Sequence, residues 1–509
     1  MKIKDLTLRE KICQTVIINN PESHFEKFGG YKKFFEKYPV GGIFLGGSIV
    51  GGHMPGTDEM FELVDEWNNE MKVPTIFCCD YENGEDEPHQ MALGATHDKE
   101  LAYESGRVRA KGLKRQGKHW MFNPVVDMVM SEVAPINIRA IGDSPEVASE
   151  MIVEMIKGAN SENVLSTAKH FPGMGRELMD THLTKVDVML SKEEWDSTYR
   201  VIYKKLIDNG LMSVMSAHMS LPCYQKERME NGYPPVCTVS KELITDLLKD
   251  DLGFQGVVVT DALTMGGTAG NSVEFAVEAF KAGHDMLLWP PLEYVDVLEE
   301  KILNGEISEE RLDDAVERVF RIKEFVKAGK RDCEIGDDSN VAKKIAEKSI
   351  TLMNNFNGVI PLDKEKIKKM LLVTPAKDDV SYKKLLYLKE IFESLGIEVI
   401  HCKDLWIPEL KNNEKEVDFT LFACFEGPST VPGPILINGE NGASIWAAQT
   451  ADVNKTIVAS FGSPFLYSEY FKCFPTYVNV YSPEKVSCEA FVKAIFGEIE
   501  CEGKSPVKV

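Results

Sequence analysis

The feature of the sequence that most restricts its fold is a series of eight short apolar runs within about the first three hundred residues. Segments with helical periodicity separate the runs, as at residues 58–71, 144–160 and 272–283. Nearly continuous apolar runs are typical of parallel strands covered on both faces. Eight such strands alternating with helices predict a (β/α)8 barrel of the TIM type. The runs cover residues 14–19, 40–46, 75–80, 119–127, 164–170, 211–218, 256–261 and 284–290.

Five of these runs end in a polar residue suited to chemistry, namely Asp80, Asp127, His170, His218 and Asp261. In such a barrel the C-terminal ends of the strands meet at one mouth, where catalytic groups lie. The alternative is that these residues cap the helices that follow them, a common use of Asp. One or two caps would be ordinary, but five polar ends, two of them His, favour a functional site.

The pattern changes after about residue 325. Residues 326–345 are polar and charged, which predicts a linker, and residues 346–509 alternate shorter strand-like and helical segments. We therefore predict a TIM-barrel catalytic domain over residues 1–325, the linker over 326–345, and a smaller α/β sandwich domain over 346–509.

Composition excludes several classes of partner. The formal net charge of −22 argues against nucleic acid and anionic membranes, because both need a basic face. No apolar stretch approaches the length of a membrane span, and the N-terminus lacks the apolar region of a secretory signal. The eleven cysteines are scattered without a C-x-x-C pair, so they predict neither a disulfide framework nor a zinc site. We expect a reduced cytoplasmic protein without a metal or cofactor.

The stretch from Ala168 to His182, AKHFPGMGRELMDTH, carries the strongest catalytic candidates. Asp180 and His182 lie two residues apart in a loop, where a turn can bring a carboxylate against an imidazole. That contact would fix the tautomer of the ring and leave its other nitrogen to act as an acid or base. A chance Asp-x-His in a surface loop is the alternative. The position directly after Lys169 and His170, at the expected mouth, favours the acid/base interpretation.

Asp261 ends the buried run GVVVTD and is the second candidate. It could serve as a nucleophile, a base, a metal ligand or a helix cap; because no other cluster has metal-ligand spacing, the first two are preferred. Lys169, His170 and Arg139 suit a polar, hydroxyl-rich substrate, although Lys169 could instead be a lysine that extends toward solvent. Asp80 lies in a very acidic loop, where it either binds sugar hydroxyls or is solvated.

These stretches resemble glycoside hydrolase family 3, and within it the β-N-acetylglucosaminidase branch. The matching segments run in family order and include LTLREKICQ, DYENG, FNPVVDM, AKHFPGMG, DTH, LGFQGVVVTDALTMGG and AGHDMLL. They cover almost the whole expected barrel and the start of the second domain. The Lys-His-Phe-Pro-Gly stretch followed by Asp-x-His is highly specific, because the Asp-His pair distinguishes this branch from the β-glucosidases.

The resemblance implies a role for each candidate residue. It makes Asp261 the nucleophile, His182 the general acid/base and Asp180 its partner, with Asp80, Arg139, Lys169 and His170 holding the hydroxyls of the sugar. The implied activity is that of a retaining, exo-acting β-N-acetylglucosaminidase, which cleaves terminal N-acetylglucosamine from cell-wall or chitin fragments through a covalent glycosyl-enzyme. The glycine-rich loop would be a hinge that moves the acid/base.

The sequence departs from the family pattern at two positions, and the second departure leaves open the binding of the sugar's far edge and the identity of the sugar. The family commonly has a second His where this chain has Met174. It also commonly has an Arg some eight residues beyond the position of Asp80, where this chain reads GEDEPHQ and has no Arg.

Three alternatives to this activity stay open: a family 3 β-glucosidase or xylosidase, a β-N-acetylglucosaminide phosphorylase with phosphate as the acceptor, and a sugar-binding or structural protein on an inactive barrel. The phosphorylase stays an alternative because a neutral His, unlike a carboxylate, does not repel phosphate. The presence of acid, partner and nucleophile together disfavours the inactive barrel.

Overall fold

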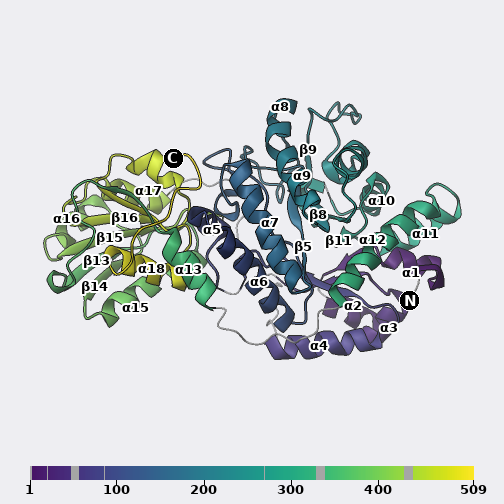
Figure 1. Ribbon diagram of the computed structural model, residues 1–509, viewed down its shortest axis with the longest axis horizontal. Helices are drawn as coiled ribbons and strands as arrows, with labels where there is room; N and C mark the ends of the chain where they lie inside the picture. Colours follow the sequence, from purple (N-terminus) through teal and green to yellow (C-terminus); the bar gives the residue numbers. More distant parts are fainter. Residues whose placement is uncertain are drawn as a thin grey trace. The chain divides into compact units, whose positions relative to one another are not determined.

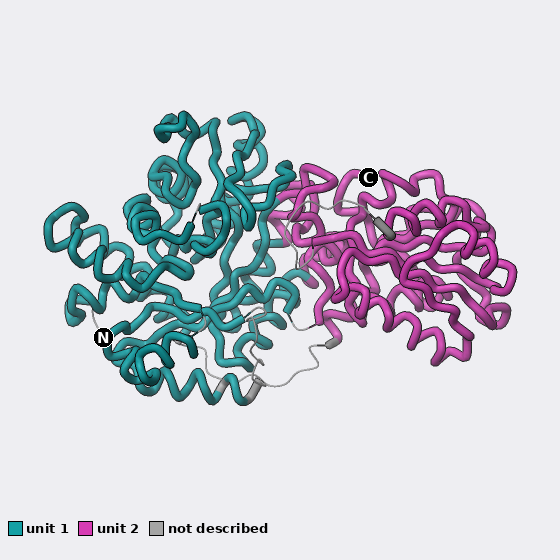
Figure 2. The backbone as a smooth tube through the Cα atoms, turned by 180° about the vertical axis from the view of Figure 1, so that it is seen from behind, with its two compact units in different colours: residues 1–84, 102–127, 152–336 teal, residues 85–101, 128–151, 337–509 magenta. Residues whose placement is uncertain are grey.

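The computed structural model describes residues 3–19, 21–46, 57–84, 86–268, 270–327, 339–428 and 439–509, which form two compact units (Figure 2). Unit 1 contains residues 1–84, 102–127 and 152–336, and unit 2 contains residues 85–101, 128–151 and 337–509. Unit 2 therefore takes in two segments that precede residue 325 in the sequence. The predicted boundaries at 325 and 345 stay a prediction, and residues 328–338 of the predicted linker lie outside the described residues.

Each of the eight apolar runs contains strand structure in unit 1, with the fifth run divided into two short strands at Thr167. The three helical segments named above correspond to α4 (Thr57–Glu70), α7 (Pro145–Ser161) and α10 (Val273–Ala282). The strands are β1 (Val16–Ile18), β2 (Gly42–Phe44), β3 (Ile76–Cys79), β4 (Trp120–Met121), β5 (Leu165–Ser166), β6 (Ala168–Phe171), β8 (Ser213–Ser216), β10 (Val257–Thr260) and β11 (Leu287–Leu288).

All neighbouring pairs among these strands are parallel. One ladder runs in the order β11-β1-β2-β3-β4-β5, and a second runs β10-β8-β6. Two parallel bridges, Val125 with Lys169 and Val259 with Met286, connect the ladders at both ends. Following the pairs and bridges from β1 through the other strands therefore leads back to β1. Because the strands are parallel, their C-terminal ends lie at one edge. The predicted α/β class is confirmed.

The register of β8 and β10 sets the height of the residues that follow them. Val257–Thr260 pair one to one with Ser213–Ser216, and every one of these eight side chains is buried. The next residues in the two segments, Asp261 and Ala217, therefore leave the sheet at the same level. Three successive Val residues favour strand structure here, because β-branched side chains pack well on a pleated surface.

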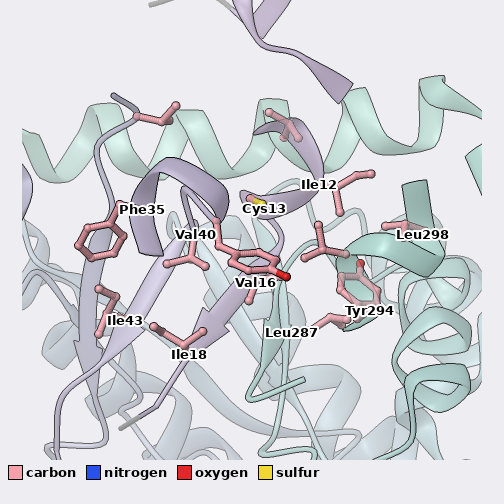
Figure 3. Packing of buried hydrophobic residues seen from close by; sticks show 14 of the residues in the cluster. Ile12, Cys13, Val16, Ile18, Phe35, Val40, Ile43, Leu287, Tyr294 and Leu298 are labelled. Carbon is pink, nitrogen blue, oxygen red and sulfur yellow. The ribbon is translucent and has the colours of Figure 1, made fainter. Parts of the chain in front are cut away.

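The core of unit 1 joins the first and last parts of its sequence. Val16 and Ile18 of β1, Ile43 of β2 and Leu287 of β11 point into one apolar cluster (Figure 3). Tyr294 and Leu298 of α11 (Glu293–Leu303) and Ile12 and Cys13 of α1 (Leu8–Cys13) close it. Burial of this surface is what holds β1 against β11.

Unit 2 is built on one mixed sheet with the strand order β12-β17-β16-β15-β13-β14. Only β12 and β17 are antiparallel among these neighbours, and helices including α15 (Tyr387–Ser394), α16 (Ile407–Asn413) and α18 (Lys485–Ile495) lie around the sheet (Figure 1). The strands are β12 (Thr351–Asn355), β13 (Lys369–Val373), β14 (Glu398–Cys402), β15 (Phe419–Cys424), β16 (Thr456–Ser460) and β17 (Thr476–Asn479). Within the described part of the chain, no helix has the length and apolar character needed to cross a membrane.

Candidate active site

Asp261 stands directly after β10, and backbone hydrogen bonds fix it there. Its N–H donates to the carbonyl of Ser216 (2.9 Å), and its Oδ1 accepts from the N–H of Ala262 (2.8 Å). Its side chain is only 16% exposed, and its Oδ2 lies 4.0 Å from Nε2 of His170. Burial acts to raise the pKa of this carboxyl, but nearby charges, that of His170 foremost, lower it by more. The carboxylate is therefore ionised at neutral pH although most of it is shielded from solvent.

His170 is oriented by a buried carboxylate. Its Nδ1 donates to Oδ2 of Asp127 (2.6 Å), and Asp127 also accepts from the backbone N–H groups of His170 and Met174. The pairing of β6 with β8 is irregular between Lys169 and Phe171. Such an irregularity redirects side chains that would otherwise alternate between the two faces of the strand. It explains how the neighbours Lys169 and His170 both contact carboxylates that follow parallel strands of unit 1.

Lys169 bridges two carboxylates in the loop after β3. Its ammonium lies 3.0 Å from Oδ1 of Asp80 and 2.7 Å from Oε1 of Glu82. The lysine side chain is 2% exposed, whereas that of Asp80 is 54% exposed. A buried ammonium needs such partners, because removing a charge from water is costly. Lys169 thus holds the Asp80 loop in place while Asp80 presents oxygen to solvent.

Asp180 and His182 form the expected pair. Oδ1 of Asp180 accepts from both Nδ1 of His182 (2.7 Å) and the backbone N–H of His182 (2.9 Å). Asp180 is almost fully buried, while the imidazole is 54% exposed. The carboxylate therefore fixes the ring from the protein side and directs Nε2 away from it, as an acid/base requires. His182 is also among the groups whose charge lowers the pKa of Asp261, so the two sites interact.

Gly173, the first glycine before this pair, is a closely packed position, and the hinge expected from the sequence stays a prediction. Gly173 has φ +110°, and a Cβ there would come within 2.3 Å of the ring of Tyr199. The carbonyl of Pro172 accepts from the indole of Trp195 (2.8 Å), and that of Met174 accepts from the Tyr199 hydroxyl. The segment needs glycine because the chain must pass close to an aromatic ring in a left-handed conformation.

Arg139 differs from the other predicted residues because it belongs to unit 2, at the end of the short helix η2 (Asn137–Arg139). The structure brings together Asp80, Lys169, His170 and Asp261 in unit 1, with Asp180 and His182 on the adjoining loop. The role of Arg139 stays a prediction. The described residues contain no group of three or more His, Cys, Asp or Glu side chains placed to hold a metal ion.

The sequence reasoning assigned no role to two residues that support the site. His218 lies buried beside the loop of Asp261, with its Nε2 donating to the carbonyl of Ala262 (2.9 Å) and its Nδ1 2.7 Å from the Thr238 hydroxyl. Asp127 orients His170. Asp127 and His218 both end an apolar run, so the sequence did contain a signal that they lie near the site. Glu82 carried no such signal, because its partner Lys169 is distant in the sequence.

Comparison with known proteins places the chain in a family. The family model for the glycosyl hydrolase family 3 N-terminal domain matches residues 7–322. A β-N-acetylglucosaminidase/β-glucosidase from Cellulomonas fimi is 30% identical over 328 residues, which cover 59% of this chain and 58% of the relative. The match thus spans less than two thirds of that protein.

Two solved structures resemble the whole chain. One is a family 3 β-N-acetylglucosaminidase from Paenibacillus sp. str. FPU-7, at 25% identity and a TM-score of 0.83, covering 99% of both chains. The other is the β-glucoside phosphorylase BglX, at 25% identity and a TM-score of 0.85, covering 99% of this chain and 94% of the other. With the family model matching more than half of its length, this chain belongs to glycoside hydrolase family 3.

Proposed function

We propose that this protein is a retaining, exo-acting β-N-acetylglucosaminidase that cleaves terminal N-acetylglucosamine from cell-wall or chitin-derived oligosaccharides. The observation that carries the proposal is the Asp180–His182 pair (2.7 Å), which interacts with the charge of Asp261. In the fold we propose, the circuit of parallel strands is a (β/α)8 barrel over residues 1–325, followed by a linker over 326–345 and an α/β sandwich domain over 346–509.

Asp261 is the nucleophile in this mechanism. Its carboxylate attacks the anomeric carbon and forms a glycosyl ester, while His182 gives its Nε2 proton to the oxygen of the departing aglycone. The lowered pKa of Asp261 keeps the attacking oxygen ionised. Asp180 favours the protonated imidazole before transfer and holds the ring in one orientation.

In the second step His182 acts as a base and Asp261 is the leaving group. The neutral His182 takes a proton from water, and the hydroxide attacks the anomeric carbon as the ester bond to Asp261 breaks. Two inversions return a β-configured product. Asp80, Lys169 and His170 would bind the sugar hydroxyls beside Asp261, and we assign Arg139 to the same substrate. The fixed geometry of the Lys169–Asp80 and His170–Asp127 pairs supports this role.

A phosphorylase is the second candidate, with phosphate replacing water as the acceptor. Two observations favour keeping it: the acid/base is an imidazole, which is neutral when the acceptor arrives, and a solved β-glucoside phosphorylase resembles the chain over its whole length. We also propose a cytoplasmic location, because the cysteines of the described residues are free thiols.

The proposal is tested with an aryl β-N-acetylglucosaminide and the matching aryl β-glucoside, each with and without phosphate. A hydrolase acting on N-acetylglucosamine releases the free sugar from the first substrate at a rate that phosphate does not change. Formation of a sugar 1-phosphate would establish the phosphorylase instead. Preference for the glucoside would assign another family 3 specificity, and no turnover of either substrate would contradict a glycosidase of these sugars.

A further inference from the structure

The loop after the nucleophile is joined by hydrogen bonds to the backbone of the acid/base itself. The N–H of Gly266 donates to the carbonyl of His182 (2.9 Å), and the N–H of Gly267 donates to the carbonyl of Thr181 (3.0 Å). Both glycines lie within six residues of Asp261 in the chain. The two segments that carry the catalytic groups are therefore in direct contact, although about eighty residues separate them in the sequence.

Close approach, not backbone freedom, explains the glycines at these positions. A Cβ at Gly266 would lie 2.5 Å from the carbonyl oxygen of Leu183 and 2.9 Å from that of His182. A Cβ at Gly267 would lie 3.0 Å from the Thr181 oxygen and 2.7 Å from Cβ of His218. A side chain at Gly266 must therefore displace the backbone of Leu183 and His182, and a side chain at Gly267 must displace either His218 or the segment of Thr181.

The acid/base loop is the neighbour that would move. On the other side of Gly267, His218 is buried and bonded at both ring nitrogens, to Thr238 and to the carbonyl of Ala262. By contrast, the His182 ring is 54% exposed, and Met179 and Leu183 on either side of the Asp-His pair are 57% and 61% exposed. Asp180 and Thr181 are buried, but the exposed side chains of Met179, His182 and Leu183 provide little packing, so the backbone bonds from the glycines contribute to the positioning of His182.

We propose that Gly266 and Gly267 are positioning residues that set the distance and direction of His182 relative to Asp261. This inference rests on the proposed function, in which His182 is the acid/base. Proton transfer depends steeply on geometry, and a misplacement of about 1 Å can lower a rate about a hundredfold. The glycines thus act on the protonation of the leaving group and not on the attack by Asp261.

The test substitutes Gly267→Ala in the full chain, with Gly266→Ala as a second variant, because Gly266 is exposed and the three atoms nearest to the added methyl group all belong to the acid/base loop. We expect kcat/KM to fall about tenfold to a hundredfold on aryl glycosides with poor leaving groups. Activated aryl glycosides, which need no proton, should change less than about threefold. The rate at which a fluorinated N-acetylglucosamine, with its acetamido group intact and a strong leaving group, labels the nucleophile should stay as in the wild type. Thr264→Ala, at an exposed position of the same loop, is the matched control and should leave all three measurements unchanged.

The decisive comparison is made in a His182→Ala background. A residue that acts only through His182 has nothing left to position there, so adding Gly267→Ala should cost less than about twofold. Full additivity, or equal loss on activated and unactivated substrates in both glycine variants, would overturn the inference. Failure of the proposed function has a different signature, since His182→Ala alone would then show no dependence on the leaving group.

Discussion

Nε2 of His170 lies 4.0 Å from Oδ2 of Asp261, while the other nitrogen of the ring is bonded to Asp127 at 2.6 Å. His170 thus stands between two carboxylates, and we propose that it acts on the charge of the nucleophile as well as on the sugar. Burial alone would raise the pKa of Asp261, and the His170 charge is the largest of the effects that lower it. This arrangement lets a carboxylate at the end of a buried strand remain ionised.

His170→Gln should move the acid limb of the kcat/KM profile to higher pH. Removal of the charge leaves burial as the main influence on Asp261, so its pKa rises and the nucleophile becomes protonated at a pH where the wild type is ionised. The pH dependence of kcat/KM measures this shift separately from any loss of sugar binding. An acid limb at the wild-type position would show that another group controls it.

Asp180→Asn should move the alkaline limb to lower pH. Oδ1 of Asp180 accepts from Nδ1 of His182, and a neutral amide stabilises a protonated ring much less than a carboxylate does. The imidazole would then lose its proton earlier as the pH rises. The profile should be recorded on a substrate with a poor leaving group, where protonation limits the rate. If the limb does not move, Asp180 has only a structural role.

Lys323→Met should remove one contribution to the pH dependence of the free energy of unfolding. Burial lowers the pKa of Lys323 from 10.5 to about 7, and its ammonium contacts Gln14 and the carbonyl of Pro74. Between these pH values the unfolded chain holds the proton and the folded chain does not, so stability rises with pH through this window. Below pH 7 both states are protonated and this contribution is flat.

Denaturant unfolding at pH 7, 8, 9 and 10 measures the effect. The free energy of unfolding of the wild type, relative to Lys323→Met, should increase by up to about 1.4 kcal/mol per pH unit. A constant difference across this range would mean that Lys323 keeps its proton in the folded state.

The sequence predicted the strands better than the contacts between them. Each apolar run became a strand or a pair of strands, because burial on both faces leaves a local signature. Asp80, His170 and Asp261 could be recognised because they end such runs. The contact of Gly267 with Thr181 and the ion pair of Lys169 with Glu82 could not, since both arise when distant segments pack together. The close packing of Gly173 against Tyr199 could not be predicted either, because flexibility and close approach select the same residue.

The account depends most on Asp261 as the nucleophile, and a mechanism-based label tests this directly. A fluorinated N-acetylglucosamine that keeps its acetamido group and carries a strong leaving group slows breakdown of the glycosyl-enzyme, so the intermediate accumulates. Intact mass should increase by one glycosyl unit, and peptide analysis should place the adduct on Asp261. Asp261→Asn should take up no label, while His182→Ala should still be labelled. An adduct on another residue, or turnover of the natural sugar with no covalent intermediate, would contradict the account.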